Sequence, residues 1–122
     1  MGWFSRLFGL AEKKLPVHVD ATNFEAEVLR SAIPVVLDVW SPMCGPCQQL
    51  EPIVMALAAR YDGRVKVAEL NARDAPAIAN GLGVEGTPTV LYFRDGKVVE
   101  RTVGFRGQPW HEEIIESELL SG

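Results

Sequence analysis

The chain has 122 residues, the size of one domain, and 48% of them are hydrophobic, which is enough for one ordinary core. Its formal net charge of −4 and the absence of a basic stripe argue against nucleic acid as a partner. No apolar run approaches the roughly 20 residues that span a bilayer, and two cysteines are too few for a secreted disulfide scaffold. We therefore expect a globular domain in a reducing, cytoplasmic compartment.

The first 14 residues differ in pattern from the rest of the chain. Their apolar residues recur at helical spacing, which predicts a short amphipathic extension over residues 1–15, followed by a domain over residues 16–122. Exposed large apolar side chains invite aggregation, so we favour packing of this extension on the domain over docking to a partner or membrane surface. The apolar positions are Trp3, Phe4, Leu7, Phe8 and Ala11.

Strand and helix patterns alternate through the remainder of the chain. Strands are expected over residues 17–19, 35–40, 64–70, 89–93 and 97–103, and helices over residues 24–29, from the cysteine pair to about residue 60, over 75–80 and over 109–120. Thr22 and Glu25 have the spacing of a capping box for the first helix. Asp95-Gly96 predicts a tight hairpin turn. The order βαβαβαββα indicates one mixed sheet of about five strands with about four helices on its two faces.

Asp38 is an anomaly in the expected strand over residues 35–40. The strand is otherwise a continuous apolar run, which is typical of a strand buried on both faces. A carboxylate there is either satisfied by hydrogen bonds or kept neutral. Because an isolated buried anion is costly, we expect the pKa of Asp38 to be raised.

Cys44 and Cys47 are the only cysteines, and their spacing suits a reversible disulfide or half of a zinc site. A structural zinc site normally needs four nitrogen or sulfur ligands. The remaining candidates, His18 and His111, lie near opposite ends of the chain, so no metal is expected. The intervening Gly-Pro is typical of a turn into a helix, which inert structural cysteines do not need.

These motifs, in this order, resemble the thioredoxin family over residues 17–120. The segment 38–47 carries most of the resemblance, and Gly86-Thr87-Pro88-Thr89 matches the family's cis-proline loop. Further matches are Pro52 in a kinked active-site helix and the glycines Gly96 and Gly104. The resemblance implies a thioredoxin fold. Gly-Pro between the cysteines resembles the reducing members of the family.

The expected chemistry divides the two cysteines by position. Cys44 precedes its helix, where unpaired N–H groups and the positive dipole end stabilise a thiolate nucleophile. Cys47, one turn inside, then resolves the mixed disulfide. Pro46 removes an N–H that the first turn does not need and stiffens the loop that begins at Gly45. The resemblance gives Asp38 the role of taking the proton of Cys47.

The resemblance also implies a substrate groove. A cis Pro88 would place backbone groups of Thr87 beside the sulfurs, where an extended substrate pairs with them, and Gly104 leaves room for it. We expect Trp40 to pack against the active-site loop. We expect His18 and His111 to be surface residues without a role, and Trp110 to anchor the last helix in the core. A solvated acidic face is expected on the same helix, at Glu112, Glu113, Glu116 and Glu118.

Three residues depart from the family pattern. Met43 stands where tryptophan usually precedes the first cysteine, and Arg73 stands where many members have aspartate. Glu69 stands where the best-known members have lysine near the buried aspartate. A like charge there should raise the pKa of Asp38 further.

The resemblance implies a monomeric protein-disulfide reductase without a bound cofactor. Its electrons would come from NADPH through a thioredoxin reductase, and its substrates would be disulfide-containing proteins. Two alternatives remain open at this point. One is a binding or adaptor subunit that uses the fold independently of redox state. The other is a specialised disulfide oxidant or isomerase.

Overall fold

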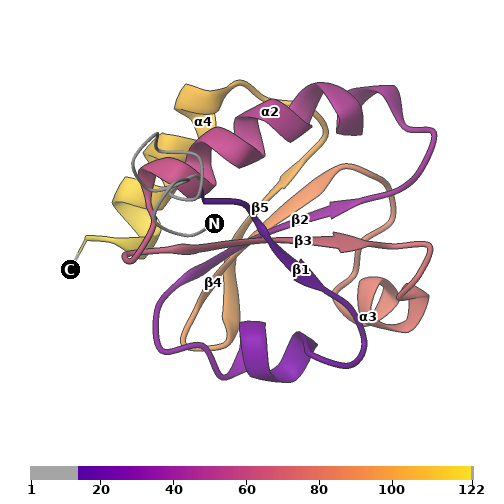
Figure 1. Cartoon of the computed structure of the whole chain (residues 1–122), viewed down its shortest axis with the longest axis horizontal. Helices are drawn as coiled ribbons and strands as arrows, with labels where there is room; N and C mark the ends of the chain where they lie inside the picture. The colour runs from indigo at the N-terminus through magenta and orange to yellow at the C-terminus, as the bar shows by residue number, and fades with distance from the viewer. Residues whose placement is uncertain (1–13, 122) are drawn as a thin grey trace, which may run out of the picture.

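A five-stranded mixed sheet forms the centre of the molecule in a computed structural model that describes residues 14–121 (Figure 1). The strand order is β1-β3-β2-β4-β5, in which β1, β3 and β2 run parallel and β4 and β5 are antiparallel neighbours. The strands are β1 (Val17–Val19), β2 (Val35–Trp40), β3 (Lys66–Asn71), β4 (Thr89–Arg94) and β5 (Lys97–Val103). The expected mixed sheet and the Asp-Gly hairpin are thus confirmed.

Helices cover both faces of this sheet (Figure 1). One face carries α2 (Gly45–Arg60), α4 (Gln108–Ile114) and the π-helical turn η2 (Ile115–Leu119). The other face carries the π-helical turn η1 (Glu25–Leu29) and α3 (Pro76–Gly81). The element order matches the prediction. The last expected helix is divided into α4 and η2, and Leu120 N–H donates to Ile115 O across η2 (3.0 Å).

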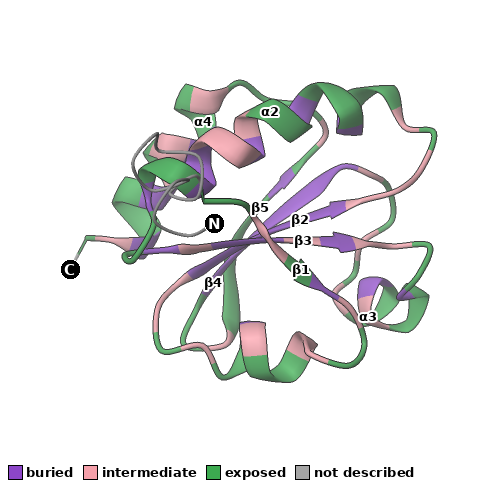
Figure 2. Cartoon of the chain, viewed as in Figure 1, coloured by how far each residue is buried: buried purple, intermediate pink, exposed green. Residues whose placement is uncertain are grey.

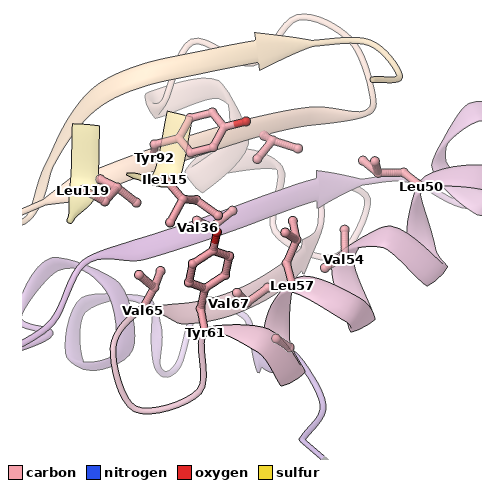
Figure 3. Close-up of a cluster of buried hydrophobic side chains, with 12 residues drawn as sticks. Val36, Leu50, Val54, Leu57, Tyr61, Val65, Val67, Tyr92, Ile115 and Leu119 are labelled. Atoms are coloured by element: carbon pink, nitrogen blue, oxygen red, sulfur yellow. The ribbon is translucent and has the colours of Figure 1, made fainter. Parts of the chain in front are cut away.

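Each face has its own hydrophobic core, and the central strands β2 and β4 are the most buried, whereas the edge strand β5 is mostly exposed (Figure 2). Side chains of α2 point toward β2 in the first core (Figure 3). This core contains Val36, Leu50, Val54, Leu57, Tyr61, Val65, Val67, Tyr92, Ile115 and Leu119. Because successive residues of a strand face opposite ways, Asp38 lies on the same face as Val36, toward α2.

The register of the parallel strands positions the polar residues of the site. Asp38 is aligned with Glu69 on β3 and with Val90 on β4. β2 leads directly into the turn before α2, so the carboxyl end of the central strand and the amino end of the helix meet at one edge of the sheet.

The prediction of a capping box formed by Thr22 and Glu25 is wrong. Thr22 Oγ1 and N–H both donate to Asp20 Oδ1 (2.6 and 2.8 Å), and η1 has no side-chain cap. The short Asp20 side chain competes for local backbone donors and forms a turn ahead of the helix. The backbone N–H of Phe24 donates to Asp20 O (3.0 Å), so the chain enters η1 through this turn.

The expectations for His111 and Trp110 are also wrong. His111 is 1% exposed, whereas Trp110 is 44% exposed and stacks against the Arg106 guanidinium 4.3 Å from its ring centre. The residues that face the sheet from α4 and η2 recur every four positions, at His111, Ile115 and Leu119. His111 therefore occupies a core position that an apolar pattern does not reveal.

Two of the four expected solvent-facing glutamates connect the last helix to α2. Glu112 Oε2 accepts from Arg60 Nη1 (2.7 Å), and Glu116 Oε2 accepts from Tyr61 Oη (2.9 Å). The predicted amphipathic extension lies outside the described residues, apart from its last two positions.

Candidate active site

The cysteine pair lies at the start of α2. Cys44 caps this helix, and the two sulfurs form a disulfide with Cα atoms 5.2 Å apart. Cys47 N–H donates to Cys44 Sγ (3.2 Å) and closes the first turn. Pro46 occupies this first turn, where the missing N–H costs no helical hydrogen bond.

The two cysteines differ in exposure. Cys44 is half-buried, whereas Cys47 is 6% exposed, and Gly45 and Pro46 between them face solvent. Met43 is 96% exposed and has a φ of 58°. An approaching partner therefore reaches the sulfur of Cys44 and the thioether of Met43 first. The positive end of α2 stabilises a thiolate at Cys44.

The loop before β4 lies against Cys44. The Thr87–Pro88 bond is cis, as the sequence predicted, and Thr87 O and Oγ1 lie 3.7 and 3.8 Å from Cys44 Sγ. A hydrogen bond between Thr87 Oγ1 and Ser41 Oγ (2.6 Å) connects this loop to the end of β2. Gly104 N–H donates to Pro88 O (2.8 Å), so the end of β5 joins the same edge.

Asp38 lines an open pocket of about 350 Å³, which Cys47 and Glu51 also line. It is 5% exposed, and among residues 14–121 its Oδ1 has no hydrogen-bond partner. Burial, followed by the charges of Glu69 and Glu51, raises the pKa of Asp38 to about 7. The predicted direction of this shift, and the contribution of Glu69 to it, are confirmed.

Glu69 is held at both of its carboxylate oxygens. Trp40 Nε1 donates to Oε1 (2.6 Å), and His18 Nδ1 lies 2.7 Å from Oε2. Trp40 thus contributes a polar contact in addition to the packing expected of it. His18 is exposed, as predicted, but it is a partner of the site rather than a residue without contacts.

Sequence reasoning did not identify Ser41 or His18 as part of this site. The contacts of both depend on residues 46 and 51 positions away in the sequence, which only the sheet order brings close. Arg73 is exposed, and its N–H donates to Asn71 Oδ1 (2.9 Å) at the turn after β3.

Residues 14–121 contain no cluster of three or more His, Cys, Asp or Glu side chains arranged to hold a metal ion. In the same range, no helix has the length and apolar character needed to cross a bilayer.

Comparison with known proteins identifies the family. The thioredoxin family model matches residues 15–116. Thioredoxin 1 of Synechococcus elongatus is 44% identical over 85 residues, which cover 70% of this chain and 78% of that protein. Thioredoxin 1 of Nostoc is 38% identical over 101 residues, which cover 83% of this chain and 94% of that protein. The chloroplastic thioredoxin M5 of Oryza sativa is 39% identical over 105 residues, which cover 86% of this chain and 61% of that protein.

The sheet order, the disulfide at the start of α2 and these relatives agree with one another. The expected fold and dithiol-disulfide exchange through Cys44 and Cys47 are both confirmed. The chain therefore belongs to the thioredoxin family of thiol-disulfide oxidoreductases.

Proposed function

We propose that Cys44 is the nucleophile, Cys47 the resolving cysteine and Asp38 the proton acceptor of a protein-disulfide reductase. The observation that carries this assignment is the contrast in exposure. The half-buried Cys44 can meet a large substrate, whereas Cys47 is only 6% exposed, too little for a protein substrate to attack directly. Attack by the exposed sulfur and resolution by the buried one follow from this arrangement.

In the first step, the Cys44 thiolate attacks one sulfur of the substrate disulfide. A bond forms between the two sulfurs, the substrate S–S bond breaks, and the departing substrate thiolate takes a proton from solvent. The thiolate at Cys44 is favoured by the positive end of α2 and by the Cys47 N–H aimed at its sulfur. The product is a mixed disulfide between Cys44 and the substrate.

In the second step, Cys47 loses its proton to the Asp38 carboxylate and attacks Cys44 Sγ. The mixed disulfide breaks, the second substrate thiolate leaves and takes a proton from solvent, and Cys44 and Cys47 become the disulfide that the structure contains. The substrate has gained two electrons and two protons in total. A pKa of about 7 suits Asp38 to this role, because a general base works best when its pKa is near the working pH.

The substrate groove follows the same edge of the molecule. Thr87 offers backbone groups next to Cys44, the exposed Met43 directly precedes this cysteine, and Gly104 N–H donates to Pro88 O. A Cβ at Gly104 would meet no atom within 4 Å, so the surface beside this loop is open. An extended substrate segment would pair with Thr87 as an added strand.

The partners and the compartment follow from the same assignment. The oxidised pair would be reduced by a thioredoxin reductase, with NADPH as the electron source, and the protein would act as a cytoplasmic monomer without a cofactor of its own. Family membership supports the reductase, and one of the relatives is a chloroplastic thioredoxin. A reduction potential of about −270 mV would support a reductase, and a potential of about −120 mV would indicate an oxidant.

Cysteine variants test the division of roles. Cys44→Ser should abolish reduction of insulin disulfides, whereas Cys47→Ser should still attack and accumulate as a mixed disulfide. Mass spectrometry of the trapped adduct and the turnover rate give the two readouts. Normal turnover by Cys47→Ser, or trapping by Cys44→Ser instead, would contradict the assignment.

A further inference from the structure

Three charged side chains form one row across three neighbouring strands. His18 on β1 is aligned with Glu69 on β3, and Glu69 is aligned with Asp38 on β2. The row runs from solvent to the interior, since the side chains of His18 and Glu69 are 61% and 24% exposed and Asp38 is 5% exposed. Glu69 is therefore the link between an exposed imidazole and the buried carboxyl that shares a pocket with Cys47.

Glu69 cannot turn away from this row without losing two hydrogen bonds. Its Oε1 accepts from the indole of Trp40 at 2.6 Å, and its Oε2 lies 2.7 Å from His18 Nδ1. Both contacts orient the carboxylate at the wall of the pocket that contains Asp38 and Cys47. A negative charge fixed there opposes ionisation of Asp38.

A positive charge on His18 acts in the opposite direction. An imidazolium paired with Glu69 cancels much of the field that the carboxylate presents to Asp38, whereas a neutral imidazole does not. The other charged groups near His18 are Asp20, whose Oδ2 lies 3.7 Å from Nε2, and Asp74. From α2, Glu51 faces Asp38 and adds to the negative field. All of these groups favour a protonated His18 or a neutral Asp38.

We propose that His18 is a positioning residue for the resolving step, because it orients Glu69 and offsets the charge that Glu69 presents to Asp38. The proposal rests on the assignment of Asp38 as proton acceptor for its kinetic consequence, but not for its effect on Asp38 itself. The bond to Glu69 raises the pKa of His18, so the imidazole is charged over more of the neutral range.

Coupling of this kind gives the titration of Asp38 a recognisable shape. As the pH rises, His18 loses its charge, and the remaining negative charge of Glu69 makes Asp38 harder to ionise. Ionised Asp38 in turn helps to keep His18 protonated. The two titrations are therefore spread over a wider pH range than independent groups would show, with a Hill coefficient below 1 for Asp38.

The test is a carboxyl-carbon NMR titration of Asp38 in the full oxidised chain. His18→Gln should raise the pKa of Asp38 by about half a unit, less than the one to three units that adjacent charges cause, and should steepen its curve. His18→Lys keeps a positive charge and should leave the pKa at or below the wild-type value. Lys97→Gln, which removes one positive charge from the hairpin beyond the site, is the matched control and should shift nothing.

The Glu69→Gln background shows whether Glu69 transmits the effect. Adding His18→Gln to Glu69→Gln should shift the titration of Asp38 less than it does in the wild-type background, because without Glu69 the imidazole is neither held in the row nor kept charged by its partner. A purely structural role would change the melting temperature and give the same Asp38 titration in the Gln and Lys variants. Equal Asp38 titrations in wild type, His18→Gln and His18→Lys would overturn the proposal.

Kinetics separate this proposal from the one on which it rests. If Asp38 accepts the proton of Cys47, His18→Gln should move the pH profile of mixed-disulfide resolution upward by the same half unit, about a threefold loss of rate on the acid side of the profile. A shifted Asp38 titration with an unshifted rate profile would contradict the role of Asp38 in resolution and, with it, the kinetic part of the proposal. The charge coupling through Glu69 would then still stand on the NMR result.

Discussion

Asp38 and His111 are buried titratable residues on the same side of the sheet, and they serve different ends. Within residues 14–121 each has one polar atom without a partner, Oδ1 of Asp38 and Nε2 of His111. Burial favours the neutral form of both, and it raises the pKa of the carboxyl and lowers that of the imidazole. Their surroundings decide what this common effect does.

His111 lies in a closed network. Its Nδ1 is 2.7 Å from Tyr92 Oη, which is 3.0 Å from Thr102 Oγ1, and Trp110 Nε1 donates to the same threonine oxygen (3.0 Å). Asp38 instead faces an open pocket that it shares with Cys47. A buried ionisable group thus stabilises the fold where its partners enclose it, and supports chemistry where a reacting atom and solvent can reach it.

The largest expected effect is a gain of stability on removing the carboxyl of Asp38. In the unfolded chain Asp38 ionises near its model value of 3.8, whereas in the folded chain it stays protonated until about pH 7. Its stabilising contribution is therefore fully present below pH 3.8 and is lost as the pH rises through about 7. Asp38→Asn should raise the free energy of unfolding at pH 8 by up to about 4 kcal/mol.

Denaturant unfolding of the oxidised proteins at pH 5 and pH 8 measures this effect. The difference between variant and wild type should be larger at pH 8 than at pH 5, because the unfolded chain gains free energy by ionising Asp38 above pH 3.8, whereas the folded chain keeps this carboxyl protonated until about pH 7. Equal differences in unfolding free energy at pH 5 and pH 8 would mean that the pKa of Asp38 is not raised.

His111 should give a pH dependence of opposite sign. Its pKa is lowered in the folded chain, so its contribution is present above the unfolded value of 6.5 and is lost as the pH falls through the folded pKa. His111→Asn keeps a polar group near Tyr92 but does not titrate. In an Asp38→Asn background, the free energy of unfolding should fall less between pH 6.5 and pH 5 with His111→Asn than with His111 present. An identical fall in the two proteins would contradict a lowered pKa of His111.

The closed network predicts a smaller effect for one hydroxyl. Tyr92→Phe leaves His111 Nδ1 without a partner in the core and should cost about 1–3 kcal/mol of unfolding free energy. Tyr61→Phe is the matched control, because its hydroxyl donates to the exposed Glu116, which water can satisfy. This change should cost about 0.5–1.5 kcal/mol, and an equal or larger loss at Tyr61 would argue against the network.

Much of this architecture follows from local sequence. The bounds of β2 and β5 match the apolar run and the hairpin pattern. The presence of a carboxyl in the otherwise apolar β2 correctly indicated that the pKa of Asp38 is raised. The position of the disulfide at a helix start likewise follows from the Cys-Gly-Pro-Cys motif. These features depend on spacing and residue type within a few positions.

The features that sequence reasoning missed depend on tertiary placement. His111 is buried because of how α4 and η2 face β4, and polarity alone indicated a surface residue. The contact between His18 and Glu69 requires that β1 pair with β3 in a particular register. The turn at Asp20 forms in place of the Thr22–Glu25 capping box because Asp20 accepts the hydrogen bonds of the Thr22 N–H and hydroxyl groups, which the capping box also needs.

The most direct test of the account is the pH profile of mixed-disulfide resolution in wild type and Asp38→Asn. A single-turnover experiment would follow decay of the adduct between Cys44 and a substrate peptide by rapid quenching. We predict that the wild-type rate rises with an inflection near pH 7, and that Asp38→Asn loses this inflection and is at least about tenfold slower at pH 7. Equal rates with the same inflection in both proteins would contradict the claim that Asp38 takes the proton of Cys47.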